Sequence, residues 1–410
     1  MLLRTLFSRP AIWLYTLLLL SLNILILIAI SRGLAPSLLI EHDSGPAIDH
    51  IAFWAAGWLA NHGDAVAAYD DVAIAAVQSA GLGYEYTGVM PWFYPPLAQI
   101  MSQPFAHFSL IWSFIIWNMA GLALLAFVSW RILPDPLAVL LAAASGGVTS
   151  LYSGQIGLFS AAISGLCLLS LRRSDGGGVW LAFLLLKPQT VFVIPLVLAL
   201  TGRWRSIAVA CLTGVGLVAV SALWLGGEVW LVFIGTIAET ADLFLVDPAS
   251  SVLWDQYVSA YGVALYNGAP FELAVTTQGL VSLTAVTVAV LTLRILGPTD
   301  AAVAIILYAA VVASPRIYVY DISILAIGAL FHVRASISKG WTWWEPPLFA
   351  VGILLLEISF AIVIHAAVLI GPLFLIGAYF RHVRGARPLP HCNKPTVRSG
   401  YCCRIEKDAP

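Results

Sequence analysis

Long apolar segments that recur along almost the whole chain constrain its fold more than any other feature. A segment of about 20 apolar residues is long enough to cross a bilayer as a helix. Only 10% of the residues are charged, against about 25% in soluble domains. The sequence therefore predicts an all-α polytopic membrane protein. Its apolar segments lie at Ala11 to Ile30 and at roughly 91–108, 109–131, 135–151, 155–171, 178–201, 206–225, 276–296, 299–315, 317–333, 345–361 and 364–380.

The distribution of charge predicts the orientation. Residues 33–130 and 206–293 contain acidic residues but no Lys or Arg, and Lys and Arg favour the cytoplasmic side. We therefore expect two long outer loops, at about 31–90 and 226–275, each carrying interfacial helices. The first segment has basic flanks and no clear cleavage site, which indicates an uncleaved anchor. Residues 1–380 are predicted to form one integral membrane domain, and residues 381–410 a basic, disordered cytoplasmic tail.

Two segments decide how many times the chain crosses the bilayer. In the preferred arrangement, 91–108 dips into the membrane without crossing, and 178–201 is a broken hairpin that turns near Lys187-Pro188. Interrupted helices of this kind occur where the backbone lines a protein cavity. In the alternative arrangement both segments cross fully, which places Arg131 and the 172–173 pair outside. The charge pattern favours the first arrangement.

The first polar loop holds a candidate general base, Asp49. Ser44 or Gly45 can cap a helix there, and Pro46 suits its first turn. Asp49 would then lie near the N-terminus of an amphipathic helix on the membrane surface, where backbone N–H groups favour an ionised carboxylate. A carboxylate held at the bilayer edge can accept a proton. The alternative is a solvated acid with no role beyond the helix terminus.

In the preferred topology, the unusual polar motifs all reach the outer face. Three cations lie there, Arg32, Lys187 and Arg316. A cation in or near a bilayer is costly and usually has a specific partner. A lipid phosphate is one such partner; an ion pair with a loop acid, or snorkelling at a helix end, is the alternative.

The order of several motifs resembles glycosyltransferase family eighty-seven. These motifs are DHIAFWAAGWLANHG followed by YD, then FYPPL, SGQIG, LLLKPQ and SPRIYVYD, within about residues 45–335. The resemblance implies a GT-C-like bundle of about 10–13 transmembrane or half-spanning helices. It also implies inverting transfer of a hexose, usually mannose, from a polyprenyl-phosphate donor at the outer face of the bacterial inner membrane. Actinobacterial members carry a His pair after the Ser-Pro, where this chain has Tyr318, Tyr320 and Asp321, so no histidine role is carried over.

Roles can then be assigned by position and by chemistry. The family's catalytic acid falls on Asp49, as general base. We expect the donor phosphate at Lys187, Arg316 and Gln155. The acceptor or sugar is expected at Tyr69, Asp70, Tyr94, Tyr318, Tyr320 and Asp321.

The expected partners are the polyprenyl-phosphate-linked sugar donor, a lipid or glycan acceptor, and membrane lipids. No cofactor is expected, because the sequence has no nucleotide-binding fingerprint. No nucleic acid partner is expected. No metal is expected either. Asp70-Asp71 is typical of a loop turn, and the spacing of the tail's His391, Cys392, Cys402 and Cys403 matches no zinc finger. A transporter or flippase of a lipid-linked sugar is the alternative function.

Overall fold

The computed structural model describes residues 48–86, 88–190, 192–245, 257–361 and 368–384. Within these ranges the regular elements are helices, as the all-α prediction requires. The predicted first span, the caps at 44–46 and the tail beyond residue 384 lie outside them. The α-helices are α3 (Ile48–Asn61), α4 (Asp71–Leu82), α5 (Pro96–Ser102), α6 (Leu110–Ile132), α7 (Pro136–Ser153), α8 (Gly157–Leu171), α9 (Gly177–Phe183), α10 (Val193–Leu200), α11 (Trp204–Leu225), α12 (Glu228–Leu245), α13 (Ala260–Tyr266), α14 (Phe271–Leu296), α15 (Asp300–Ala313), α16 (Ser323–Lys339), α17 (Glu345–Ala361) and α18 (Ile370–His382). The 3₁₀ helices are η2 (Val66–Tyr69), η3 (Phe105–His107), η4 (Leu184–Leu186), η5 (Pro188–Thr190) and η7 (Val319–Ile322).

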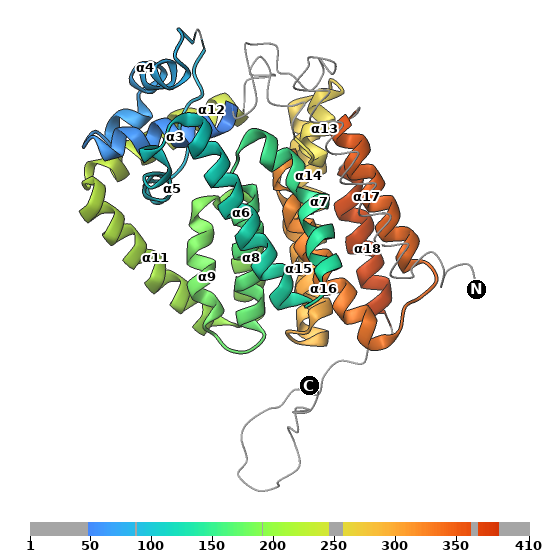
Figure 1. Ribbon diagram of the computed structural model, residues 1–410. Helices are drawn as coiled ribbons and strands as arrows, with labels where there is room; N and C mark the ends of the chain where they lie inside the picture. Colours follow the sequence, from blue (N-terminus) through green and yellow to red (C-terminus); the bar gives the residue numbers. More distant parts are fainter. Residues whose placement is uncertain (1–47, 87, 191, 246–256, 362–367, 385–410) are drawn as a thin grey trace, which may run out of the picture.

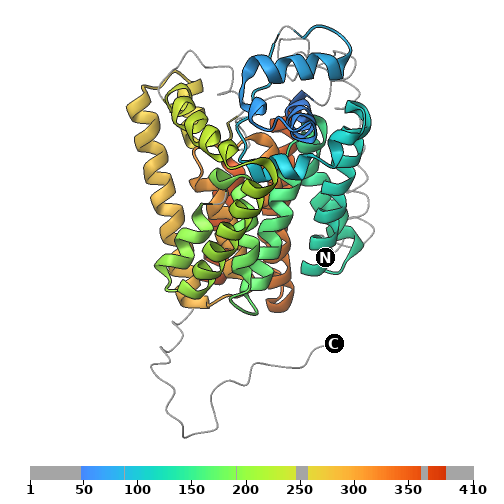
Figure 2. The same ribbon diagram turned by 90° about the vertical axis from the view of Figure 1, so that its left-hand side faces the viewer.

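The helices form a bundle with a layer across one end. α3, α4, α5 and α12 make up this cap layer, and the long helices run beneath it (Figure 1, Figure 2). Four described helical stretches are long and apolar enough to cross a membrane: Leu110–Ile132, Trp204–Leu225, Phe271–Leu296 and Val319–Lys339. The chain is therefore a polytopic helical membrane protein, as its composition indicates.

The centre of the bundle is α15, which is buried along nearly its whole length. A helix that is apolar on every side belongs in an interior. Its many alanines, such as Ala302, Ala304 and Ala310, are fully buried. Small side chains let neighbouring backbones approach closely in membrane bundles. α15 thereby packs between α14 and α16.

Cations gather at the end of the bundle opposite the cap layer, which we call the basic end. There the carboxylate of Asp300 pairs with both Arg172 and Arg334. Arg294, at the end of α14, donates to the carbonyl of Leu200 over 2.6 Å. Helix ends far apart in the sequence therefore meet on one side, and they carry the arginines that the charge pattern places together.

Residues 177–190 and 192–200 form the interrupted hairpin that the sequence predicts for 178–201. α9 leaves the basic end, η4 and η5 make the turn, and α10 returns. The backbone of Lys187 is not helical (φ −149°, ψ 71°), and Pro188 has no N–H with which to continue a helix. At the basic end, the carboxylate of Asp175 accepts from the hydroxyl of Ser206 over 2.9 Å, which fixes the start of α9 beside α11.

Residues 91–108 do not cross the bundle, as expected. α5 has seven residues, so it is about 10 Å long and too short to span a bilayer. It packs against α3 in the cap layer, where Asn61 donates to the carbonyl of Gln103 over 2.9 Å. A Cβ on Gly57 would lie 2.8 Å from the backbone of Ser102, so this packing needs a glycine.

The structure differs from the expected surface helix at α3. The expectation was one apolar face against lipid, but Phe53, Trp54, Ala55 and Ala56 are all buried. α4, α5 and η3 cover the helix on several sides. The indole N–H of Trp54 donates to the carbonyl of Phe108 over 2.9 Å, so its polar atom is satisfied within the protein instead of at the headgroups.

Candidate functional site

Asp49 is the second described residue of α3 and lies half-buried where the cap layer meets the bundle. Burial raises the pKa of its carboxyl to about 6. Hydrogen bonds from Gln155 and Ser153 and the charge of Lys187 act in the opposite direction and limit the rise. The group is therefore mostly ionised at pH 7 but close to its midpoint, which suits a general base.

The amide of Gln155 is held so that its N–H₂ faces Asp49. Its Oε1 accepts from the hydroxyl of Tyr94 over 2.8 Å and from the backbone N–H of Ile156 over 3.2 Å. An amide whose oxygen is occupied in this way presents its donors to the remaining partner. Gln155 therefore orients the carboxylate.

The turn that carries Gln155 needs a glycine before it. Gly154 has φ +69°, and a Cβ there would lie 2.6 Å from the Cβ of His50. His50 is fully buried, its Nε2 lies 2.8 Å from the hydroxyl of Ser113, and burial lowers its pKa to about 3. Sequence reasoning missed His50. A histidine next to the candidate base in an apolar helix was the available signal.

A buried ion pair lies beside Asp49. Lys187 Nζ donates to both carboxylate oxygens of Asp321, over 2.7 and 2.9 Å, and both side chains are almost fully buried. The ammonium also lies 4.4 Å from the ring centroid of Tyr320 and 5.5 Å from that of Tyr318. Of the two sequence interpretations of Lys187, the ion pair with an acid is present in the structure.

Residues 314–322 reach this position because several distant segments hold them. Ser150 donates to the carbonyl of Tyr320 over 2.7 Å, and Ser314 donates to the carbonyl of Gln189 over 2.8 Å. A Cβ on Gly157 would lie 2.3 Å from the oxygen of Tyr320, so α8 can begin here only with glycine. These contacts bring η7 against the α7–α8 turn and the hairpin at Lys187.

Arg316 lies on the same segment but farther out. It is half-buried, and its charge acts on Tyr261 and Tyr318. The backbone N–H of Val258 donates to the carbonyl of Ile317 over 2.9 Å, which attaches this segment to the second polar loop. Of the two candidate phosphate-binding cations, Lys187 therefore lies on the buried side of residues 314–322. Arg316, which belongs to that segment, lies toward the surface.

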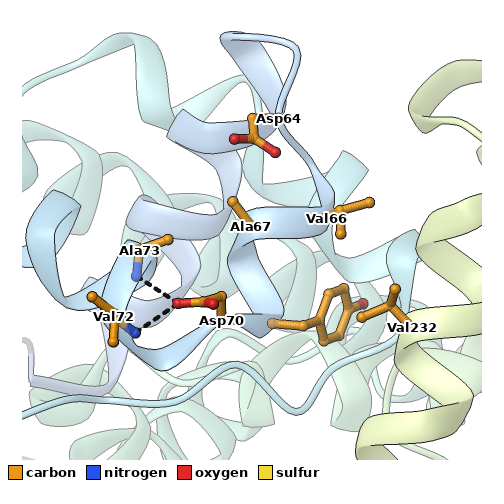
Figure 3. Close-up of a pocket in the computed structure, with 8 residues that line it drawn as sticks. Asp64, Val66, Ala67, Asp70, Val72, Ala73 and Val232 are labelled. Carbon is orange, nitrogen blue, oxygen red and sulfur yellow. Dashed lines mark hydrogen bonds between the residues drawn. The ribbon is translucent and has the colours of Figure 1, made fainter.

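An open pocket of about 620 Å³ adjoins the site in the cap layer (Figure 3). The carboxylate of Asp70 points to the N–H groups of Val72 and Ala73 and caps α4. The hydroxyl of Tyr69 donates to the carbonyl of Tyr94 over 2.8 Å, which joins the pocket to the cluster around Asp49. The pocket is lined by Asp64, Val66, Ala67, Tyr69, Asp70, Val72, Ala73 and Val232.

The structure thus brings most of the predicted site residues together. Those in or at the edge of the central cluster are Asp49, Gln155, Lys187, Tyr94, Tyr318, Tyr320, Asp321 and Arg316. Tyr69 and Asp70 lie in the neighbouring pocket. Ser153 also reaches Asp49. The cluster brings together a carboxyl group whose pKa is about 6, a buried ammonium and several aromatic rings.

Comparison with known proteins identifies a family. The model of glycosyltransferase family 87 matches residues 92–315, a range that includes Tyr94, Gln155 and Lys187 and is more than half of the chain. Asp49 and Asp321 lie outside that range, but the fold packs both against it. No curated protein and no solved structure matches significantly. The chain belongs to glycosyltransferase family 87 and is a glycosyltransferase.

Proposed function

We propose that this glycosyltransferase transfers a hexose, with mannose as the expected sugar, from a polyprenyl-phosphate-linked donor to a lipid or glycan acceptor, with inversion. The observation that carries the proposal is the pairing of Asp49, whose pKa is about 6, with the buried cation Lys187 in one cluster. Sugar transfer needs a base for the acceptor and a counter-charge for the departing phosphate. The cluster offers both.

Asp49 acts on the acceptor hydroxyl. Its carboxylate takes the proton while the hydroxyl oxygen forms a bond to the anomeric carbon of the donor sugar. The bond from that carbon to the phosphate oxygen breaks, and the polyprenyl phosphate leaves with the electron pair. Gln155 holds the carboxylate in position throughout. One displacement by one base inverts the anomeric centre.

Lys187, Arg316 and Gln155 are assigned to the donor phosphate. A lysine ammonium has three donors, and Asp321 takes two of those of Lys187. Among the described residues no other acceptor is seen for the third donor, which we assign to a phosphate oxygen. Charge-assisted hydrogen bonds of this kind are about twice as strong as neutral ones. Asp321 keeps the ammonium charged and in place while the site is empty.

The acceptor is assigned to the aromatic side of the cluster and to the cap-layer pocket. The rings of Tyr318 and Tyr320 are stacked, with centroids 5.0 Å apart and planes 8° apart, and such rings suit the apolar faces of sugars. With Tyr94 and Asp321 they surround the reacting centre. The pocket at Tyr69 and Asp70 then holds the more distant part of the acceptor.

The donor class can be tested directly. Purified chain is given labelled mannose either as polyprenyl-phosphate-mannose or as a nucleotide-linked sugar. Labelled product is expected only from the lipid-linked donor, since the cluster provides a buried ammonium for one phosphate and the sequence has no nucleotide-binding fingerprint. Product formed from the nucleotide sugar alone would contradict the proposal.

We also assign the chain to the GT-C class and to the bacterial inner membrane, with the cap layer facing the periplasm. The arginines of the basic end support this orientation, since Lys and Arg favour the cytoplasmic side. In a background without native cysteines, Asp71→Cys is expected to react with an impermeant thiol reagent in intact spheroplasts. Arg173→Cys is expected to react only after lysis. Both positions are exposed, and the reverse pattern would invert the assignment.

We expect Gln155 to shift the pH dependence of transfer. Transfer needs ionised Asp49, so the rate should fall as pH drops below about 6. Gln155→Met removes a hydrogen bond that lowers the pKa of Asp49, so the acidic midpoint should move upward. A hydrogen bond to a charged group contributes about 1.5–3 kcal/mol, which corresponds to roughly one to two pH units. The pH profile of transfer is the measurement.

The matched control for this prediction is Gln103→Met. Gln103 accepts from the indole of Trp224 over 2.8 Å in the cap layer and does not contact Asp49 in the described structure. Its midpoint should stay at the wild-type value. An unchanged midpoint in Gln155→Met would show that Gln155 does not tune the base.

A further inference from the structure

A second buried polar cluster lies at the basic end, far from Asp49. It consists of His332 from α16, Glu345 from the start of α17 and His382 from the end of α18. All three side chains are buried, His332 and Glu345 completely. Three helices therefore each bring one metal-ligating side chain to the same buried position.

The histidines are incompletely hydrogen-bonded. Among the residues that the structure describes, Nε2 of His332 and both ring nitrogens of His382 have no hydrogen-bond partner. A buried polar atom left without a partner costs about 1–3 kcal/mol. Nε2 of His332 lies 3.6 Å from Oε1 of Glu345, which is too long for a hydrogen bond. An ion pair between His332 and Glu345 would not account for the two ring nitrogens of His382 that lack a partner among the described residues.

The spacing fits a shared metal ion. One ligand atom from each of the three residues can be chosen so that all lie within 4.8 Å of one another. Ligands at about 2.0–2.1 Å from a tetrahedral zinc ion are about 3.4 Å apart. The observed 3.6 Å between His332 and Glu345 is close to that separation. His382 supplies the third ligand, and its ring centroid lies 5.2 Å from that of His332.

Surrounding groups orient the ligands as they do in metal sites. Oε2 of Glu345 accepts from the N–H and the hydroxyl of Thr342, over 2.6 and 2.8 Å. Arg381 pairs with this same oxygen at 3.2 Å. Oε1 accepts from the hydroxyl of Ser336 over 2.5 Å and is also the atom nearest His332. The other nitrogen of His332, Nδ1, lies 3.4 Å from the hydroxyl of Tyr308. One carboxylate oxygen and one nitrogen of His332 are thus directed toward the common centre.

We propose that His332, Glu345 and His382 bind a divalent transition metal, zinc by the nature of the ligands, and that the ion ties α16, α17 and α18 together. Two histidines and a glutamate are a known zinc ligand set, with a water in the fourth position. This open ligand set also occurs in catalytic zinc sites, but the cluster lies at the basic end and joins three helices, so we assign the ion a structural role. The proposal does not depend on the proposed donor or acceptor.

The test is metal analysis of the full chain, purified without a histidine tag or chelator. We expect about one zinc per chain, retained through gel filtration. His332→Ala and His382→Ala should each reduce the zinc content at least about tenfold, because removing a ligand from a three-residue site removes most of its affinity. His62→Ala, at an exposed histidine of the cap layer, should retain the metal.

Two controls test whether the zinc is held by these three residues. The combined variant Cys392→Ser, Cys402→Ser and Cys403→Ser should retain zinc, which excludes the tail cysteines as the ligands. Wild-type chain stripped with a chelator should show a lower melting temperature that Zn²⁺ restores and Mg²⁺ does not; this measurement does not depend on a variant that folds poorly. Wild-type zinc below about a tenth of an equivalent, with no thermal response to Zn²⁺, would overturn the proposal.

Discussion

Asp49→Asn is expected to lower sugar transfer by roughly 10²–10⁴-fold, the usual contribution of general-base catalysis. Asn has the size of Asp and can still accept from Gln155 and Ser153, which reach this side chain. It cannot take a proton. Donor binding should persist, because the carboxylate serves the acceptor. Initial rates at saturating donor, at matched protein abundance in membranes, are the measurement.

Asp71→Asn is the matched control for this change. Asp71 is also an acid in the first turn of a cap-layer helix, but it is exposed. It should keep wild-type transfer. If Asp49→Asn keeps more than about a third of wild-type transfer, the loss is under 1 kcal/mol and Asp49 is not the base. Asp70 is a poor substitute for that role, since its carboxylate caps α4.

Breaking the Lys187–Asp321 pair is expected to have the second largest effect. Both groups are almost fully buried, so Lys187→Met or Asp321→Leu leaves one charge without its partner. Such a change costs about 3–5 kcal/mol, whereas replacing both partners by apolar residues is often neutral. The melting temperature should fall in each single variant and recover in the double variant. Thermal unfolding in detergent measures this.

Sugar transfer by the same variants distinguishes a structural role of the pair from a role of Lys187 in donor binding. If Lys187 binds the donor phosphate, the double variant recovers stability but not transfer. Arg316→Gln is the comparator. Because Arg316 is only half-buried, its loss should lower transfer at limiting donor concentration by roughly one to two decades with little change in stability. A double variant that recovers both stability and transfer would leave the pair a structural role alone.

Much of the architecture could be predicted because it depends on local sequence and on charge. Pro188 and Lys187 interrupt an apolar segment, so a turn there follows from the chemistry of proline. The arginines at helix ends gather on one side of the bundle because the preference of Lys and Arg for the cytoplasmic side acts on each loop separately.

The pairings inside the site could not be predicted in the same way. Lys187 and Asp321 are 134 residues apart, and nothing local in either segment indicates the other. The burial of α3 was missed because its apolar residues suit a bilayer as well as a protein interior. In a membrane protein these two environments select the same side chains. His332, Glu345 and His382 went unnoticed because their proximity depends on how three helices pack.

The anomeric configuration of the product tests the central claim most directly. With one base, Asp49, acting on the acceptor, transfer occurs in a single displacement. The sugar should therefore be attached with the configuration opposite to that in the lipid-linked donor. Wild-type chain is supplied with labelled polyprenyl-phosphate-mannose, and the linkage in the product is determined by NMR. Inversion is the predicted result; retention would require a covalent intermediate on a protein nucleophile and would contradict the role given to Asp49.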